Sequence, residues 1–366
     1  MLLELTETTG GREMTKRLRD LGFTIGPYAT GPHNAITDVA GVRVGHQTVI
    51  RDEPAVVRTG ITVVEPRPIT DSSLLCPGAY VAFNGNGEMT GSHWLDESGL
   101  LAGPIGITNT HQVGLVRDQL VAEMVRRAPE TEWCLPIVAE TYDGFLNDIG
   151  AFALHGDDVH GALAAASTAG SGPSPRQRGR RHRHDLPRVQ GRHRHVVTGG
   201  SGRCQQLHRR RARPGQLRQP GASSPRRSAN RCGARRQLVP LPTDPRTADA
   251  GSIIIIVATD APLLADQCRR LARRATVGLA RVGGNGGNGS GDIFLAFSTG
   301  NAVPSDAAEP VSMFALPSGS MTPLFEATAD AVEESIWNAM CAAETMVGHL
   351  GRTVHAVPTQ RLADFL

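Results

Sequence analysis

The feature that most constrains this chain is an uninterrupted apolar run that follows Ser252. It holds five β-branched residues in a row, from Ile253 to Val257, without the polar alternation of a half-buried strand. Such a run predicts a strand that is buried on both faces. We expect a helix directly after it, with Asp260 as its N-cap and Pro262 in its first turn.

Ser252 opens this strand and directly follows Gly251. Two interpretations are open from the dipeptide alone. If the chain is cut between the two residues, Ser252 carries a hydroxyl and a free α-amine with a pKa of about 7.7–8.0, which can act as general base for its own side chain. Gly251 can adopt the strained backbone that such a cut requires. The other interpretation is an ordinary serine that opens a strand after a turn.

The composition indicates a globular chain in a reducing compartment. Its 366 residues can bury a large core, and no apolar run approaches the length of a membrane span. Residues 1–7 are acidic and lack the apolar segment of a signal peptide, so we expect a cytoplasmic location. The cysteines form no C-x-x-C pair and are expected to be free thiols. They are Cys76, Cys134, Cys204, Cys232, Cys268 and Cys341.

The net charge of +3 conceals a sharp asymmetry along the chain. Residues 171–250 hold 20 Arg, no Lys and three Asp, a net charge of +17, so the other 286 residues carry −14. One interpretation is a basic, disordered arm that binds nucleic acid or another polyanion. Against it, the segment has no Phe, Trp or Tyr to stack on bases, and we do not expect a nucleic-acid partner.

Several polar stretches lie beside predicted elements. The Gly-rich stretch 83–91 contains Asn-Gly pairs, and a hairpin turn and a loop that lines a site are equally open. Residues 108–111 head a predicted helix that reaches Val125. Glu140 ends an apolar strand, where a carboxylate either faces a ligand or caps the structure. We expect residues 1–30 to be a mobile lead-in and residues 324–349 to form a long helix.

A second Gly-rich stretch, residues 283–291, formally contains G-x-G-x-x-G. That dinucleotide fingerprint must follow a strand and open a helix, whereas here the glycines follow a predicted helix and lead into a strand, so we reject it. The stretch instead delivers Ser290 and Asp292 to the start of a strand. Because side chains two apart on an extended chain point the same way, we expect these two to meet.

Together these stretches resemble the DmpA-type aminopeptidases, the L-aminopeptidase/D-amidase-esterases and their β-aminopeptidase relatives. Each stretch is weak by itself, and the combination is specific. The resemblance covers residues 30–168 and 250–358, about two-thirds of the chain. The stretches that carry it are residues 34–45, 84–91 with 93–94, 108–111, 140–148, 251–263, 289–294, and 342–346 with 353–355.

The resemblance implies a fold and a set of roles. The fold is a four-layer α/β/β/α sandwich, similar to N-terminal-nucleophile hydrolases but with different connectivity. Ser252 matches the nucleophile, and Ser290 and Asp292 match the residues that orient and polarise it. Glu140 matches the carboxylate that binds the free amine of the substrate, and Tyr142 matches an active-site tyrosine. We also expect Asn84 and Asn86 to contact the substrate.

The resemblance further implies maturation by self-cleavage at the Gly251–Ser252 bond. The two pieces, residues 1–251 and 252–366, stay together as one composite domain and assemble as a homotetramer. The expected enzyme is an aminopeptidase or amidase-esterase that acts through an acyl-Ser252 intermediate, with no metal or organic cofactor. Two alternatives are an amidase or acyltransferase of the same superfamily, and an inactive or polyanion-binding protein on the same scaffold.

Residues 169–249 do not follow the family pattern. The strand that holds the asparagine of the family's oxyanion hole is therefore missing from the sequence. We interpret this Arg-rich segment as the product of two compensating frameshifts. Shifting GC-rich codons for residues 210–219 by one nucleotide can give Val-Gly-Ala-Leu-Val-Gln-Ala-Asn-Tyr-Gly, which resembles the missing strand. Resequencing the gene tests this hypothesis, and an unbroken frame that encodes the present residues contradicts it.

Overall fold

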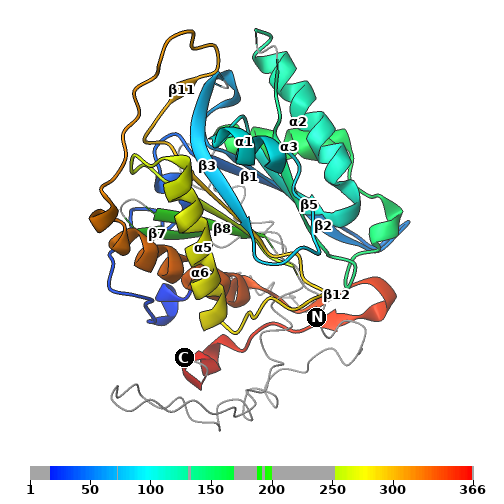
Figure 1. Cartoon of the computed structure of the whole chain (residues 1–366). Helices are drawn as coiled ribbons and strands as arrows, with labels where there is room; N and C mark the ends of the chain where they lie inside the picture. The colour runs from blue at the N-terminus through cyan, green and yellow to red at the C-terminus, as the bar shows by residue number, and fades with distance from the viewer. Residues whose placement is uncertain are drawn as a thin grey trace, which may run out of the picture.

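The computed structural model describes residues 17–71, 73–130, 133–168, 188–191, 194–199 and 252–364. Two main β-sheets carry the fold within these residues. Each sheet has one face toward the other sheet and one face toward a pair of helices (Figure 1). The arrangement is therefore the four-layer α/β/β/α sandwich that the sequence predicts.

The first sheet has four strands in the order β1-β2-β5-β6. β1 and β2 pair antiparallel, whereas β5 and β6 pair parallel and are joined through a helix, as a parallel pair requires. In the parallel pair, Thr108 lies opposite Glu140. The strands are β1 (Arg43–Arg51), β2 (Val57–Glu65), β5 (Ile105–Asn109) and β6 (Ile137–Thr141).

The second sheet has seven strands, with the path β11-β3-β10-β9-β8-β7 and β4 paired to β3. β9 and β10 pair parallel, and β3 pairs antiparallel with β10 on its other side. The strands are β3 (Leu74–Ala82), β4 (Leu100–Leu101), β7 (Arg188–Gly191), β8 (Arg194–Gly199), β9 (Ile254–Thr259), β10 (Ile293–Ser298) and β11 (Val303–Pro304). A separate hairpin pairs β12 (Met346–Val347) with β13 (Thr353–Val354).

The predicted apolar run is the central strand β9, and all six of its residues are buried. Ile254 and Ile256 point into the core between the two sheets, whereas Ile255 and Val257 point into the core under the outer helices. Full burial of each such side chain stabilises the fold by about 1.5–3 kcal/mol. Because both faces are covered, the strand needs no polar alternation, and this explains the unbroken apolar run.

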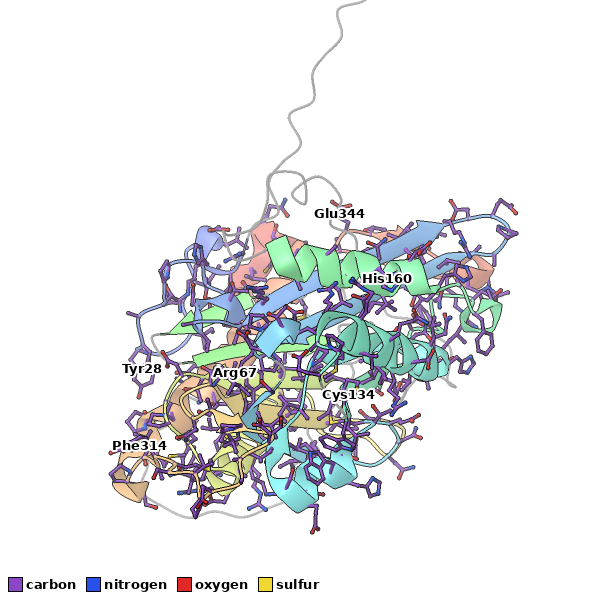
Figure 2. The ribbon with its side chains drawn as sticks, turned by 90° about the horizontal axis from the view of Figure 1, so that it is seen from above. Tyr28, Arg67, Cys134, His160, Phe314 and Glu344 are labelled. Carbon is purple, nitrogen blue, oxygen red and sulfur yellow. The ribbon has the colours of Figure 1, made fainter. Side chains whose placement is uncertain are left out.

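The helices form the two outer layers, with α2 and α3 on the first sheet and α5 and α6 on the second (Figure 1). His160 on α3 and Phe314 before α6 lie on opposite sides of the molecule (Figure 2). Among the residues with described structure, no helix is long and apolar enough to cross a membrane. The helices are α1 (Ser92–Ser98), α2 (Val113–Arg127), α3 (Gly156–Thr168), α5 (Ala265–Arg281) and α6 (Thr322–Ala342).

The predicted start of α5 is wrong. The helix begins at Ala265, and Asp260 lies exposed before it. The backbone of the intervening residues is bound elsewhere: the carbonyl of Pro262 accepts from Leu316, and the N–H of Leu263 donates to Oγ of Ser298. The predicted end of α6 is also wrong, since this helix stops at Ala342 and the chain turns into the β12–β13 hairpin.

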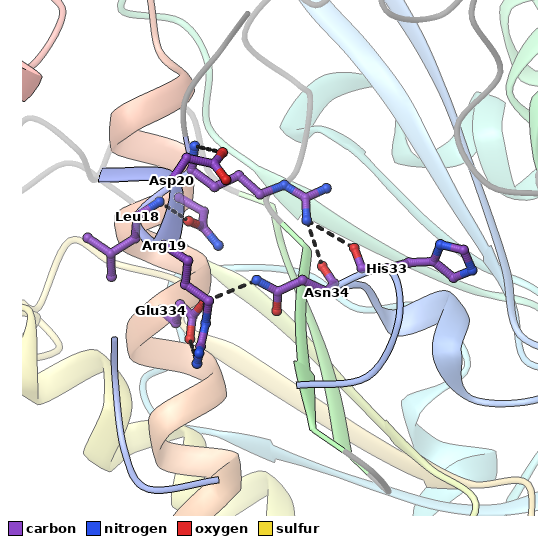
Figure 3. Close-up of polar contacts among 8 residues, drawn as sticks. Leu18, Arg19, Asp20, His33, Asn34 and Glu334 are labelled. Atoms are coloured by element: carbon purple, nitrogen blue, oxygen red, sulfur yellow. Dashed lines mark hydrogen bonds and ion pairs between the residues drawn. The ribbon is translucent and has the colours of Figure 1, made fainter. Parts of the chain in front are cut away.

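The predicted mobile lead-in is wrong for residues 17–30, because α6 anchors this segment. Leu18 is fully buried, and its N–H donates to Oδ1 of Asn338 at 2.8 Å. Two nitrogens of Arg19 each donate to Glu334 at 2.7 Å, and Nδ2 of Asn34 donates to the same carboxylate at 3.1 Å (Figure 3). Glu334 is 1% exposed, so a buried carboxylate on α6 holds the part-buried guanidinium of Arg19 near the start of the chain.

The Arg-rich segment contains two of the strands, β7 and β8, although its sequence predicts none. β8 pairs antiparallel with the central strand β9, with Val196 opposite Val257. The interpretation of the segment as a basic, disordered arm stays a prediction. The other residues between 169 and 250 lie outside the described residues, and the frameshift hypothesis stays a prediction.

Candidate active site

Five of the predicted site residues meet at one edge of the second sheet: Ser252, Ser290, Asp292, Asn84 and Asn86. β9 and β10 are parallel, so both strands begin at the same edge, with Ile254 opposite Ile293. β3 runs antiparallel to β10 and ends there, with Ala82 opposite Ile293. The segments just before β9, just before β10 and just after β3 therefore lie together. They carry Ser252, Asp292 and Asn84 respectively.

Ser252 lies at the centre of this edge and is 3% exposed. The backbone N–H of Gly291 donates a hydrogen bond to its Oγ at 3.1 Å. The neighbouring N–H of Ile253 donates to Oδ1 of Asp292 at 3.2 Å. The segment that carries the serine is therefore held against the Gly-rich stretch by two hydrogen bonds. Gly251, the other half of the predicted cleavage bond, lies outside the described residues.

Ser290 and Asp292 meet, as expected from their spacing. Oγ of Ser290 donates to Oδ1 of Asp292 at 2.7 Å, and both side chains are buried, 1% and 0% exposed. The same carboxylate oxygen thus accepts from a hydroxyl and from the backbone next to Ser252. The carboxylate of Asp292 therefore links the Ser290 hydroxyl to the segment that carries Ser252.

The Gly-rich stretch after β3 lines the site and does not form an independent hairpin. Oδ1 of Asn84 accepts from the N–H of Asp292 at 2.6 Å, and its Nδ2 donates to the carbonyl of Gly287 at 2.9 Å. Nδ2 of Asn86 donates to the carbonyl of Gly289 at 3.1 Å. Both amides therefore bind the loop that carries Ser290 and Asp292. Their contact with substrate stays a prediction.

Glu140 comes to this region from the end of β6 in the other sheet and is 2% exposed. Its Oε2 accepts from the hydroxyl of Thr110 at 2.5 Å. Gly87 fills the space between Glu140 and the serine loop: a Cβ on Gly87 would lie 3.0 Å from Oε1 of Glu140 and 2.9 Å from Cα of Gly291. A glycine at this position lets the carboxylate and the loop approach each other.

The charge of Glu140 depends on its surroundings. Burial is the largest influence and raises the pKa of this carboxyl group. Hydrogen bonds from the Thr110 hydroxyl and the Glu88 backbone lower the pKa, and the Glu88 carboxylate raises it. A cation bound beside Glu140 would favour the ionised form and offset the cost of burial. The site is therefore suited to a positively charged group.

Tyr142 lies one residue beyond the end of β6 and is 40% exposed. Its hydroxyl lies 2.5 Å from the point where a Cβ on Gly144 would be, so the ring packs over the backbone of that glycine. The tyrosine is thus exposed, whereas Ser252, Ser290, Asp292 and Glu140 are buried. Its role in the active site stays a prediction.

Three residues of the site were missed by reasoning from the sequence: Gly87, Thr110 and Gly291. Gly87 contributes space and Gly291 contributes a backbone N–H. A glycine-rich sequence does not indicate which of its glycines has such a role. Thr110 belongs to a stretch that the sequence predicts only as a helix start. Its position two residues beyond Thr108, which pairs with Glu140 in the parallel strands, is the signal that could have found it.

Comparison with known proteins agrees with this geometry. The sequence model of peptidase family S58 matches residues 34–180 and 192–354. The chain is 39% identical to the beta-peptidyl aminopeptidase BapA of Sphingosinicella microcystinivorans, over 96% of this chain and 91% of that protein. The predicted family resemblance is therefore confirmed.

Solved structures show the same similarity. A beta-aminopeptidase of Burkholderia sp. superposes with a TM-score of 0.75 and 37% identity, over 96% of this chain and 98% of the other. The L-aminopeptidase D-Ala-esterase/amidase of Ochrobactrum anthropi, described as a new variant of the Ntn-hydrolase fold, superposes with a TM-score of 0.72 and 35% identity over the same shares. The chain therefore belongs to peptidase family S58, and it is a hydrolase of the aminopeptidase class with a variant of the Ntn-hydrolase fold.

Proposed function

We propose that Ser252 is the nucleophile and that it becomes an N-terminal residue when the chain cuts itself at the Gly251–Ser252 bond. The mature enzyme releases N-terminal residues from peptides, amides or esters through an acyl-Ser252 intermediate. The observation that carries this proposal is the hydrogen bond from Gly291 N–H to Oγ of Ser252, beside the Ser290–Asp292 pair.

The chemistry follows from these groups. The free α-amine of Ser252 takes the hydroxyl proton while Oγ attacks the substrate carbonyl carbon. The carbonyl oxygen becomes an oxyanion, and we assign Gly291 N–H, which donates to Oγ of Ser252 in this structure, as a donor that stabilises it. The tetrahedral intermediate then expels the amine or alcohol, which takes the proton from the α-ammonium. Water repeats the sequence on the acyl ester and regenerates Ser252.

Ser290 and Asp292 hold this arrangement in place. Oδ1 of Asp292 binds the backbone next to the nucleophile and the hydroxyl of Ser290, so the carboxylate fixes the start of β9 relative to the loop. A negative charge here also stabilises the α-ammonium that forms during the attack. The two residues therefore orient the nucleophile and stabilise its protonated amine.

Glu140 is proposed to bind the free amine of the substrate. A buried carboxylate with hydrogen bonds to one of its oxygens suits a cationic ligand. The curated relative is named a beta-peptidyl aminopeptidase, and the Ochrobactrum enzyme is named an L-aminopeptidase and a D-Ala-esterase/amidase. We propose the same broad class of substrates for this chain: short peptides, amides and esters with a free amino terminus.

The variant Glu140→Gln tests the amine assignment. We expect kcat/KM to fall about 10- to 100-fold for an aminoacyl ester, because a hydrogen bond to a charged group contributes about 1.5–3 kcal/mol. The analogous ester without the amine should be hydrolysed nearly as before. Glu97→Gln on α1, an exposed position, is the matched control and should change neither rate. Equal losses on both esters would contradict the assignment.

Mass measurement tests both cleavage and assembly. Under denaturing conditions we expect two fragments, residues 1–251 and a fragment that begins at Ser252. Under native conditions the same sample should have the mass of four αβ units, which is the proposed tetramer. A single uncut chain of 366 residues would contradict self-cleavage, and one αβ unit alone would contradict the tetramer.

We also propose a cytoplasmic location. Four cysteines in the described part of the chain are free thiols: Cys76, Cys134, Cys268 and Cys341. Free thiols are typical of proteins in a reducing compartment. Cell fractionation checks this, and recovery of the protein with secreted or periplasmic markers would contradict it.

A further inference from the structure

Thr110 makes the shortest side-chain hydrogen bond to the carboxylate proposed to bind the substrate amine. Its Oγ1 donates to Oε2 of Glu140 at 2.5 Å. Thr110 follows directly after β5, and Glu140 lies near the end of β6, the parallel neighbour of β5. The two residues therefore come from adjacent strand ends, and the hydroxyl approaches Glu140 from within the first sheet.

The two oxygens of Glu140 face different surroundings. Oε2 is bound by Thr110, whereas Oε1 lies against Gly87, on the side of Gly291 and the serine loop. Gly291 in turn contacts Oγ of Ser252 through its N–H. The hydroxyl of Thr110 thus holds the carboxylate group in an orientation in which its other oxygen faces the reacting centre. Rotation of the carboxylate would break the hydrogen bond in a place that is closed to water, since Glu140 is 2% exposed.

Thr110 is itself held firmly. Asn109 caps the short helical turn at residues 110–112, because its Oδ1 accepts from the N–H groups of His111 and Gln112, each at 3.1 Å. Nδ2 of Asn109 donates to Oγ1 of Thr59 at 3.1 Å on the neighbouring strand β2. This buried amide fixes the backbone from which the Thr110 hydroxyl projects. The hydroxyl is therefore a preorganised donor.

We propose that Thr110 is a positioning residue for amine recognition: it holds the carboxylate of Glu140 with one oxygen turned toward the serine loop. This inference rests on the proposed function, in which Glu140 binds the substrate amine. Thr110 touches neither the substrate nor the scissile bond. It acts through Glu140, so its loss should affect substrates with a free amine and spare those without one.

The variant Thr110→Val removes the hydroxyl and keeps the shape of the side chain. We expect KM for an aminoacyl ester to rise about tenfold, which is at the lower end of what a hydrogen bond to a charged group contributes. The kcat for the same ester should change little. The matching ester without the amine should keep its KM within about twofold, and Thr110→Ser, which restores the donor, should recover most of the loss.

Thr108→Val is the matched control, because Thr108 is a buried threonine on β5, two residues before Thr110, whose hydroxyl donates to the carbonyl of Gly60 instead. This variant should affect both esters alike. Glu140→Gln, measured in parallel, separates the positioning role of Thr110 from the amine assignment of Glu140. If Glu140→Gln impairs the aminoacyl ester more than the ester without the amine and Thr110→Val does not, the role of Thr110 is wrong and the proposed function stands. If neither variant impairs the aminoacyl ester more than the ester without the amine, the amine assignment of Glu140 is wrong.

Discussion

Replacing Ser252 by alanine is expected to leave the chain uncut and to abolish hydrolysis. The substitution removes the hydroxyl that is proposed to attack the carbonyl, whereas the hydrogen bond from Ile253 to Asp292 uses the backbone and should remain. Loss of a catalytic nucleophile lowers kcat by at least about 10⁴-fold. Intact mass and the rate of aminoacyl ester hydrolysis measure the two effects on one sample.

Ser335→Ala is the control for this experiment. Ser335 is also fully buried, but it lies on α6 and donates to the carbonyl of Val332, away from the site. That variant should still be cut and active. Ser252→Cys should retain some cleavage, because a thiol is also a nucleophile. Two fragments from Ser252→Ala would show that another group cuts the chain, and the assignment of Ser252 would be abandoned.

The largest effect on stability is expected from Glu334→Ala. This carboxylate is 1% exposed and accepts from Arg19 and Asn34, so its removal leaves a guanidinium and an amide without their acceptor. Breaking a buried ion pair costs about 3–5 kcal/mol. Arg19 keeps 25% of its side chain exposed, which favours the lower end of this range. Thermal unfolding should show a decrease in Tm of several degrees.

Glu326→Ala on the same helix is the matched control. Glu326 also contacts the N-terminal segment, through the hydroxyl of Tyr28, but it is exposed. Exposed contacts of this kind contribute at most about 1 kcal/mol, so its Tm should change little. Equal shifts for the two variants would show that burial of Glu334 does not matter, and the anchor described above would lose its energetic basis.

The central strand could be predicted from the sequence because the pattern that indicates it lies within a few consecutive residues. A strand covered on both faces needs an unbroken apolar run, and residues 253–257 supply one. The meeting of Ser290 and Asp292 was predictable for the same reason, since two residues two apart on an extended chain share a face. The four-layer arrangement came from the family resemblance, which the comparisons confirm.

What could not be predicted depends on partners far along the chain. Arg19 finds Glu334 across 315 positions, so the anchored N-terminal segment looks like a mobile lead-in from its sequence. The start of α5 was misplaced because Pro262 and Leu263 are bound by Leu316 and Ser298. Thr110 and Gly291 were missed because a donor becomes recognisable only when its acceptor is placed beside it.

The order of strands in the second sheet has a consequence for the mature enzyme. The path β11-β3-β10-β9-β8-β7 alternates between the two pieces: β3, β8 and β7 precede Ser252, whereas β9, β10 and β11 follow it. The uncut chain can refold as one molecule, at a rate independent of concentration. After the proposed cleavage at Gly251–Ser252, two separate chains would first have to collide and then interleave their strands, so recovery would become second-order and slow on dilution. The proposed cleavage would thus make unfolding far harder to reverse.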